Sequence, residues 1–417
     1  MKIPRTKGTR DWSPEEMAQF RLIEDRFRNL CLKWGYQEVR TPTIESLHLF
    51  TSAGTLTPGM LNRVYSFLDW DGWSGERVVL RPDGTIPIAR LYTDSMSEKG
   101  LARLFYISNI FIFEETGTET REKWQCGTEL IGAGLPLADT ELVSLAMEIL
   151  ASLGIKDVQL RLSHAGLIKA LLAKLGLDKS EQTAVFDRIL DGDIATLAEI
   201  KSGNPELESI LPSLLNHKGR KSGFLNNLKA ITHIPELKPH LDNFMNIVNY
   251  LESLDCNYQI DIASGAGFEY YTGLIFQFYA GNKKIGGGGR YDDLISAMGG
   301  KVTPACGFAF YIDRMMKLIQ PGTGMPARIL VSTRAGESVP LKDILQASRQ
   351  LHEAGYRAEI ELTDRKPEDL SWLLEIKGGG KKLILTNLKD KKSFAAKDTG
   401  DVLRLLEAED ADKNRSA

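Results

Sequence analysis

Two short segments place acids, an amide and a hydroxyl on or just beyond predicted strands. A Leu-Arg-Pro-Asp-Gly-Thr segment puts Asp83 and Thr85 directly after a strand. In a Gln-Cys-Gly-Thr-Glu segment, the two-residue period of a strand puts Gln125 and Glu129 on one face. Carboxylates can hold an ammonium group, and amides and hydroxyls can hydrogen-bond a polar ligand. By itself, however, an acid at a strand end is more often a cap or a solvated group.

Two further segments add aromatic rings and glycines. Tyr270 and Tyr271 precede a Thr-Gly turn, and the four glycines 286–289 lead into Arg-Tyr-Asp. Adjacent tyrosines usually pack at the margin of a core, and a glycine run is more often a flexible turn than a ligand cradle. Each segment is a weak signal alone, whereas the four together are specific.

The elements that must position these residues alternate between helices and strands. Ser13 and Pro14 begin a helix predicted over 14–34, and Gly35 ends it. A second helix is predicted over 139–153, and the polar loop 114–123 separates two strands. Hairpin-like connections favour an α+β domain with an antiparallel sheet. The predicted strands are 38–42, 77–82, 104–113, 125–132, 158–162, 258–262, 274–279 and 306–310.

The order of the elements predicts a discontinuous core and a smaller second domain. Residues 1–164 and 255–318 form the core, and 165–254 are predicted as a helical insertion. The segment 319–326 has the composition of a linker. Residues 327–417 are predicted as a small α/β domain, with a helix over 341–353, a short helix before 381–386 and a final helix near 401–409.

Composition excludes some classes of function. The 417 residues carry 52 Lys and Arg against 55 Asp and Glu, a net charge of −3 that argues against nucleic-acid binding by bulk charge. With no apolar run of about 18 residues and no apolar stretch near the N-terminus, neither a membrane span nor a secretory signal is expected. Four scattered cysteines predict reduced thiols in a cytoplasmic protein, and the histidines show no metal-ligand spacing.

Over nearly the whole chain, these segments resemble the histidyl-tRNA synthetase family of class II synthetases. The resemblance implies an antiparallel sheet of six or seven strands with flanking helices, a homodimeric core, and a C-terminal domain like an anticodon-binding domain. It also implies a histidine pocket, because carboxylates suit the ligand's ammonium and aromatic walls suit its imidazole. The residues at the matching positions are Asp83, Thr85, Gln125, Glu129, Tyr270 and Tyr271.

The positions that perform chemistry in the synthetases differ here. Ile112 stands where a synthetase arginine grips the α-phosphate of ATP, and Ala266 stands where another arginine precedes the tyrosines. Loss of one such donor typically costs about 2.7–4 kcal/mol of transition-state stabilisation. We therefore expect no catalytic residue, and only residual nucleotide contacts from Glu114, Arg121 and Arg314.

The chain matches the synthetases at the histidine pocket but lacks the arginines that act on ATP. In this it resembles the non-catalytic branch of the family, the regulatory subunits of ATP phosphoribosyltransferase. That resemblance implies regulation of the first step of histidine biosynthesis in a hetero-oligomer with a short-form catalytic subunit. L-Histidine is then the ligand, and no cofactor is expected. Two alternatives stay open: a divergent, active histidine–tRNA ligase, and a synthetase-like protein with another amino acid or protein partner.

The C-terminal domain bears on the choice between these alternatives. Residues 327–417 carry 17 Lys and Arg against 16 Asp and Glu, a net charge of +1. A domain that grips tRNA is expected to be more basic. The lysines 381, 382, 389, 391 and 392 more often form a solvated face than a tRNA site, so tRNA is not an expected partner.

Overall fold

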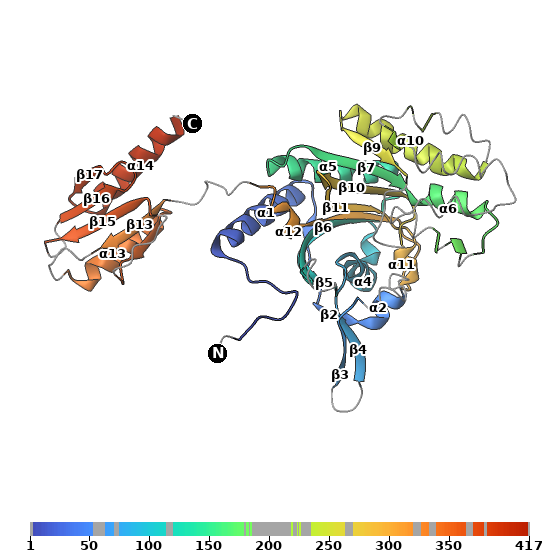
Figure 1. Ribbon diagram of the computed structural model, residues 1–417, viewed down its shortest axis with the longest axis horizontal. Helices are drawn as coiled ribbons and strands as arrows, with labels where there is room; N and C mark the ends of the chain where they lie inside the picture. The colour runs from blue at the N-terminus through green and yellow to red at the C-terminus, as the bar shows by residue number, and fades with distance from the viewer. Residues whose placement is uncertain are drawn as a thin grey trace. The chain divides into compact units, whose positions relative to one another are not determined.

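The chain forms two compact units, Met1–Pro321 and Gly322–Ala417, in the computed structural model. Figure 1 shows a large mixed unit with a central sheet and a smaller unit with a sheet of its own. The structure describes residues 3–52, 63–70, 75–113, 120–178, 235–262, 270–319, 327–332, 339–363, 370–378 and 382–415, together with short pieces between 181 and 226.

A nine-stranded sheet forms the centre of the first unit, in the order β1-β5-β6-β12-β11-β10-β7-β9-β8. The six strands from β5 to β7 pair antiparallel, while β1 joins β5, and β9 joins β7, in parallel. The antiparallel α+β fold is therefore confirmed. The strands are β1 (Gln37–Glu38), β5 (Ala102–Phe111), β6 (Glu122–Ile131), β7 (Val158–His164), β8 (Lys218–Gly219), β9 (Tyr258–Asp261), β10 (Leu274–Ala280), β11 (Lys283–Arg290) and β12 (Ala305–Tyr311).

The glycine run is not the turn that the sequence favours, because it forms the inner part of β11. Gly287 pairs with Gln277 of β10 on one side and with Ala309 of β12 on the other. A Cβ atom at Gly287 or Gly288 would collide with the backbone of a neighbouring strand. Glycine is a poor strand former by intrinsic propensity, but here it permits a close approach between strands that a side chain would prevent.

Helices cover the sheet of the first unit (Figure 1). α1 (Pro14–Lys33) has the predicted start, since Ser13 and Glu16 form a capping box. α1 and α10 (Lys238–Ser253) both pack on α5 (Pro136–Ser152), which contacts β6 and β12. The other helices of this unit include α2 (Leu47–Ser52), α4 (Thr85–Ser95), α6 (Ala165–Ala173), α11 (Leu294–Ala297) and α12 (Ile312–Met315).

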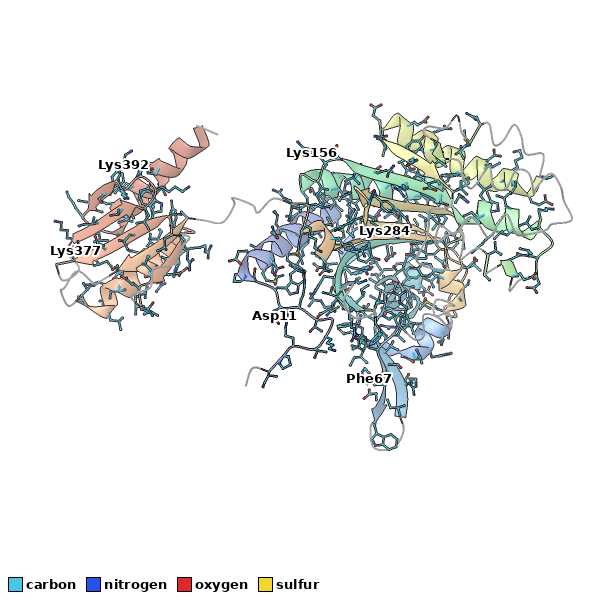
Figure 2. The ribbon with its side chains drawn as sticks, in the orientation of Figure 1. Asp11, Phe67, Lys156, Lys284, Lys377 and Lys392 are labelled. Carbon is cyan, nitrogen blue, oxygen red and sulfur yellow. The ribbon has the colours of Figure 1, made fainter. Side chains whose placement is uncertain are left out.

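A small three-stranded sheet in the order β2-β4-β3 leaves the main body as a ribbon (Figure 1). Its strands are β2 (Ile44–Ser46), β3 (Ser66–Trp70) and β4 (Gly75–Leu80), of which the sequence predicts only β4. All five residues of β3 are exposed, including Phe67, which is labelled in Figure 2. Its lack of a buried face explains why no alternating pattern marks it in the sequence.

The second unit is a five-stranded sheet, β14-β13-β15-β16-β17, with helices α13 (Leu341–Glu353) and α14 (Thr399–Arg415). Trp372 is fully buried in a separate core. The segment expected to hold a short helix contains a strand, β15, and Lys381 of the predicted lysine group lies outside the described residues. The strands are β13 (Arg328–Ser332), β14 (Arg357–Ile360), β15 (Trp372–Lys377), β16 (Lys382–Asn387) and β17 (Ser393–Ala396).

Within the described part of the chain, no helix combines the length and apolar character needed to cross a bilayer. The four cysteines form no disulfide, and three of them are buried. Burial raises the pKa of the Cys256 thiol, so this half-buried group also favours its neutral form.

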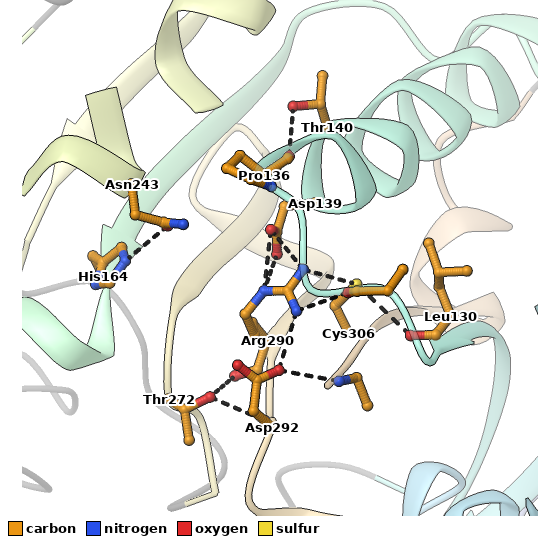
Figure 3. Close-up of polar contacts among 12 residues, drawn as sticks. Leu130, Pro136, Asp139, Thr140, His164, Asn243, Thr272, Arg290, Asp292 and Cys306 are labelled. Atoms are coloured by element: carbon orange, nitrogen blue, oxygen red, sulfur yellow. Dashed lines mark hydrogen bonds and ion pairs between the residues drawn. The ribbon is translucent and has the colours of Figure 1, made fainter. Parts of the chain in front are cut away.

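A buried ion pair joins three parts of the first unit (Figure 3). Arg290, at the end of β11, donates to both carboxylate oxygens of Asp139 on α5, at 2.8–3.1 Å. It also donates to the carbonyl of Ala133 at 3.0 Å and to Asp292 at 3.1 Å. The two side chains of the pair are only 6% and 1% exposed. The pair thus fastens the start of α5 to the centre of the sheet.

The same network fixes the turn that follows the two tyrosines. The carbonyl of Arg290 accepts a hydrogen bond from the backbone N–H of Thr272 at 2.8 Å. The hydroxyl of Thr272 in turn accepts from the backbone N–H of Asp292 at 3.0 Å (Figure 3). Because Thr272 directly follows Tyr271, the network sets where the tyrosine pair lies.

Replacing Asp139 with Asn should leave the Arg290 charge buried without its carboxylate. We expect the free energy of unfolding to fall by about 3–5 kcal/mol, measured by urea denaturation. Lys238→Ala is the control, because it breaks an exposed pair with Asp242 at 2.7 Å and should cost no more than about 0.5 kcal/mol. Equal, small losses in both variants would contradict a structural role for the buried pair.

Candidate functional site

A cavity on the central sheet collects most of the residues predicted to bind a ligand. Five of the six line it, namely Asp83, Thr85, Gln125, Tyr270 and Tyr271. The sixth, Glu129, is hydrogen-bonded to the wall of the cavity. The other lining residues are Tyr106, Ile275, Phe276, Gln277, Lys284, Gly287, Gly288, Tyr291, Gly307, Phe308, Ala309 and Tyr311.

Asp83 and Thr85 reach the cavity because β4 ends beside it and α4 begins there. The backbone N–H of Thr85 donates to Asp83 at 2.9 Å, which holds the carboxylate against the first turn of the helix. The hydroxyl of Thr85 donates to Glu129 at 2.8 Å. The hydroxyl of Tyr291 donates to the other oxygen of Glu129. One hydrogen-bonded chain therefore links α4, β6 and the segment after β11.

Glycines on the neighbouring strands leave room for the large side chains of the pocket. Glu129 on β6 pairs with Gly307 on β12, which pairs with Gly289 on β11. A Cβ atom on Gly307 would collide with the carboxylate of Glu129, and one on Gly289 would collide with the ring of Tyr271. The row of glycines therefore shapes the floor of the pocket.

Burial raises the pKa of both acids of the pocket. It raises the pKa of Glu129 to about 8, against the opposing effect of the hydroxyls of Tyr291 and Thr85, and the charge of Asp83 raises it further. Burial also raises the pKa of Asp83 to about 6, although backbone N–H groups counteract this rise. A cationic group of a ligand would favour the charged form of both carboxylates.

Gln125 supplies an amide on the face of β6 that also carries Glu129, four positions away along the strand. Its side chain is 4% exposed, and no described residue donates a hydrogen bond to its Oε1 atom. A buried acceptor of this kind is satisfied if a ligand or water donates to it. Gln125 is therefore placed to accept from a ligand's N–H group.

Arg121 and Arg314, two of the three residues predicted as residual nucleotide contacts, are not among the residues that line this cavity. Arg121 stacks on Phe113, 4.0 Å from the ring centre, and donates to the hydroxyl of Tyr65 at 3.3 Å. Arg314 donates to the carbonyl of Lys284 at 2.7 Å and lies over Tyr311. Glu114 and Ala266 lie outside the described residues.

A basic groove adjoins the pocket and shares Lys284 and Tyr311 with it. Among the described residues that line the groove, Asp313 is the one acid, and it is paired with Arg10. Such a surface attracts anions. Its basic residues are Arg10, Lys123, Lys283, Lys284, Arg314 and Lys317.

Sequence reasoning missed several residues of the pocket. Tyr106 of β5 lies across from Gly127 of β6, and only the strand register reveals that this glycine leaves space for the ring. Tyr291 belongs to the segment after the glycine run, where its hydroxyl could have marked it as a candidate. Lys284 and Tyr311 carry no motif in the sequence that would have marked them.

The arrangement can bind a small ligand that has a cationic or N–H-rich end. Buried acids and aromatic rings provide hydrogen bonds and flat walls, a typical composition for a small-molecule site. Across the described residues there is no cluster of three or more His, Cys, Asp or Glu side chains that could hold a metal ion.

Comparisons with known proteins agree on one family. A sequence model of the family "Histidyl-tRNA synthetase" matches residues 8–315. The chain is 48% identical to the ATP phosphoribosyltransferase regulatory subunit of Dehalococcoides mccartyi strain BAV1, over 98% of this chain and 99% of that protein. It is 33% identical to the histidine–tRNA ligase of Methanocaldococcus jannaschii, over 87% of this chain and 86% of that protein.

A solved structure from Bacillus halodurans C, described as an ATP phosphoribosyltransferase regulatory subunit/histidyl-tRNA synthetase, has a similar fold. Its TM-score is 0.75 at 24% identity, covering 88% of this chain and 95% of that chain. At that level of identity, the likeness establishes the class II synthetase fold.

Replacing Glu129 with Gln should change how stability depends on pH. A carboxyl pKa raised from 4.5 to about 8 means that the folded state binds the proton more tightly than the unfolded state. The unfolding free energy of the wild type should therefore decline, relative to Glu129→Gln, by up to about 1.4 kcal/mol per pH unit between about pH 4.5 and 8. Urea denaturation at several pH values without ligand measures this, with the exposed Glu98→Gln as control. Parallel curves for wild type and Glu129→Gln would contradict the assignment.

Proposed function

Because this chain belongs to the histidyl-tRNA synthetase family, we propose that it is a regulatory subunit of ATP phosphoribosyltransferase that binds histidine and does not charge tRNA. It would act in the cytoplasm as a homodimeric core bound to a short-form catalytic subunit. Histidine occupancy of its pocket would then control the first step of histidine biosynthesis. Three relatives with this printed name, at 46–48% identity over 98% of the chain, support the proposal.

One contrast within the site carries the proposal. The pocket keeps two buried acids, the buried amide of Gln125 and five tyrosines around one cavity. By contrast, Ile112 stands at the position where the synthetases use an arginine on the α-phosphate, and an aliphatic side chain can form no ion pair there. A site that binds the amino acid but cannot hold the reacting phosphate suits a sensor.

Regulation requires that histidine prefer one state of the complex over another. A ligand shifts an equilibrium only by its differential affinity for the two states. In the pocket, Asp83 and Thr85 lie at the start of α4, while Glu129 lies on the sheet and Tyr271 lies in the segment before β10. A ligand that contacts all of them would couple the start of α4 to the sheet. Ligand binding could then change the position of α4 relative to the sheet and so affect the surface of the protein.

Isothermal titration should show that the purified protein binds histidine without ATP. Glu129→Ala should weaken that binding by about 10- to 100-fold, because a hydrogen bond to a charged group is lost. In a complex with a short-form catalytic subunit, the same variant should shift inhibition to higher histidine concentrations. The exposed Glu98→Ala serves as the control. The proposal fails if the protein neither binds histidine nor raises the activity of the catalytic subunit.

The basic groove beside the pocket favours one second candidate, an active histidine–tRNA ligase. Its cations, Arg314 among them, could attract a triphosphate. Histidine-dependent exchange between ATP and pyrophosphate separates the two functions. We expect no exchange above background, with an authentic synthetase assayed in parallel. Exchange that disappears in Glu129→Ala would instead identify a ligase.

A further inference from the structure

The pocket is polarised along the strands. At one end, Glu129 of β6 shares a cross-strand row with Gly307 and accepts the hydroxyl of Thr85, which lies next to Asp83 in the cavity wall. At the other end, Gln125 pairs with Tyr311 of β12. The row of Glu129 and the row of Gln125 are four positions apart on β6, which is about 13 Å along the backbone. Both buried acids therefore lie toward one end of the cavity.

Lys284 lies at the end opposite the acids. It is near the start of β11, on the central sheet (Figure 2), and pairs with Tyr279 of β10. The next pair is Phe278 with Gly286, so Ile285 is an extra residue in the ladder and forms a β-bulge. A bulge changes the direction of the neighbouring side chains. Ile285 is buried, and Lys284 lines the ligand cavity.

The surroundings of Lys284 suit an anionic partner. Arg314 donates to the carbonyl of Lys284 at 2.7 Å, which anchors this part of the strand. Burial, together with the positive charge of Arg314, lowers the pKa of the Lys284 ammonium to about 8, so most of it remains charged at neutral pH. Among the described residues that line the cavity, Lys284 is the one basic side chain.

A free amino acid has charges that complement this arrangement. Its ammonium and imidazole N–H groups match carboxylates and an amide, and its carboxylate matches a cation. We propose that Lys284 pairs with the α-carboxylate of the bound amino acid and makes the pocket select free histidine over imidazole amines without a carboxylate. This inference rests on histidine binding as proposed above. It assigns to Lys284 the carboxylate contact that Ala266 cannot provide.

The proposal has a consequence for specificity. Histamine keeps the imidazole and the ammonium of histidine but lacks the carboxylate, so it should contact the acid end equally well. It should form no ion pair with Lys284, because it has no carboxylate to offer. The pocket should therefore discriminate between the two ligands through this one side chain.

Calorimetric titration of histidine and histamine into the full-length protein tests the pairing. We expect the wild type to prefer histidine by about 10- to 100-fold. Lys284→Met should lose about that factor for histidine while binding histamine about as tightly as the wild type. The adjacent, exposed Lys283→Met is the matched control and should behave like the wild type.

The outcomes separate this inference from the proposed function. If the wild type binds no histidine, the proposed function fails and the role of Lys284 fails with it. If histidine binds but Lys284→Met binds it equally well, only the pairing is overturned. Should that variant not fold, the wild type alone still decides, because equal affinities for histidine and histamine would exclude a carboxylate contact.

Discussion

The structure of the first unit depends on a buried guanidinium. Arg290 pairs with Asp139 and reaches the carbonyl of Ala133, so the end of β11 and the start of α5 cannot move apart without exposing or stranding a charge. Removing one partner of such a pair is far more costly than losing a surface ion pair. Because the backbone of Arg290 also holds Thr272, the constraint extends to the tyrosines of the pocket.

Close packing of strands is the second constraint, and it shapes the pocket. Glycines on β11 and β12 let Glu129 and Tyr271 lie directly over the backbone of neighbouring strands. The carboxylate is thereby removed from water and held by the hydroxyls of Thr85 and Tyr291. The desolvation that raises its pKa is the same property that would make a cationic ligand favourable, since the ligand replaces the lost solvation.

The pocket and the basic groove meet at Lys284 and Tyr311. In the proposed function, the pocket retains amino-acid recognition while the phosphate chemistry next to it is lost at Ile112. The ammonium of Lys284 at this junction could serve the ligand's carboxylate and would keep a positive charge beside the groove. The arrangement is consistent with a protein that kept the architecture of a synthetase for sensing.

The sequence by itself predicted the class of fold, the start of α1 at Ser13 and Pro14, and most strands of the main sheet, because periodicity, caps and motif order are local. The six candidate pocket residues came from the resemblance to the synthetases. The sequence did not reveal that 286–289 form a strand, that β3 exists, or that Tyr106, Tyr291, Lys284 and Tyr311 line the cavity. Those features follow from strand register and from a bulge, which bring together residues distant in the chain. Only the tertiary structure could decide them, because a glycine's conformation and a lysine's environment depend on the neighbouring strands and not on the neighbouring residues.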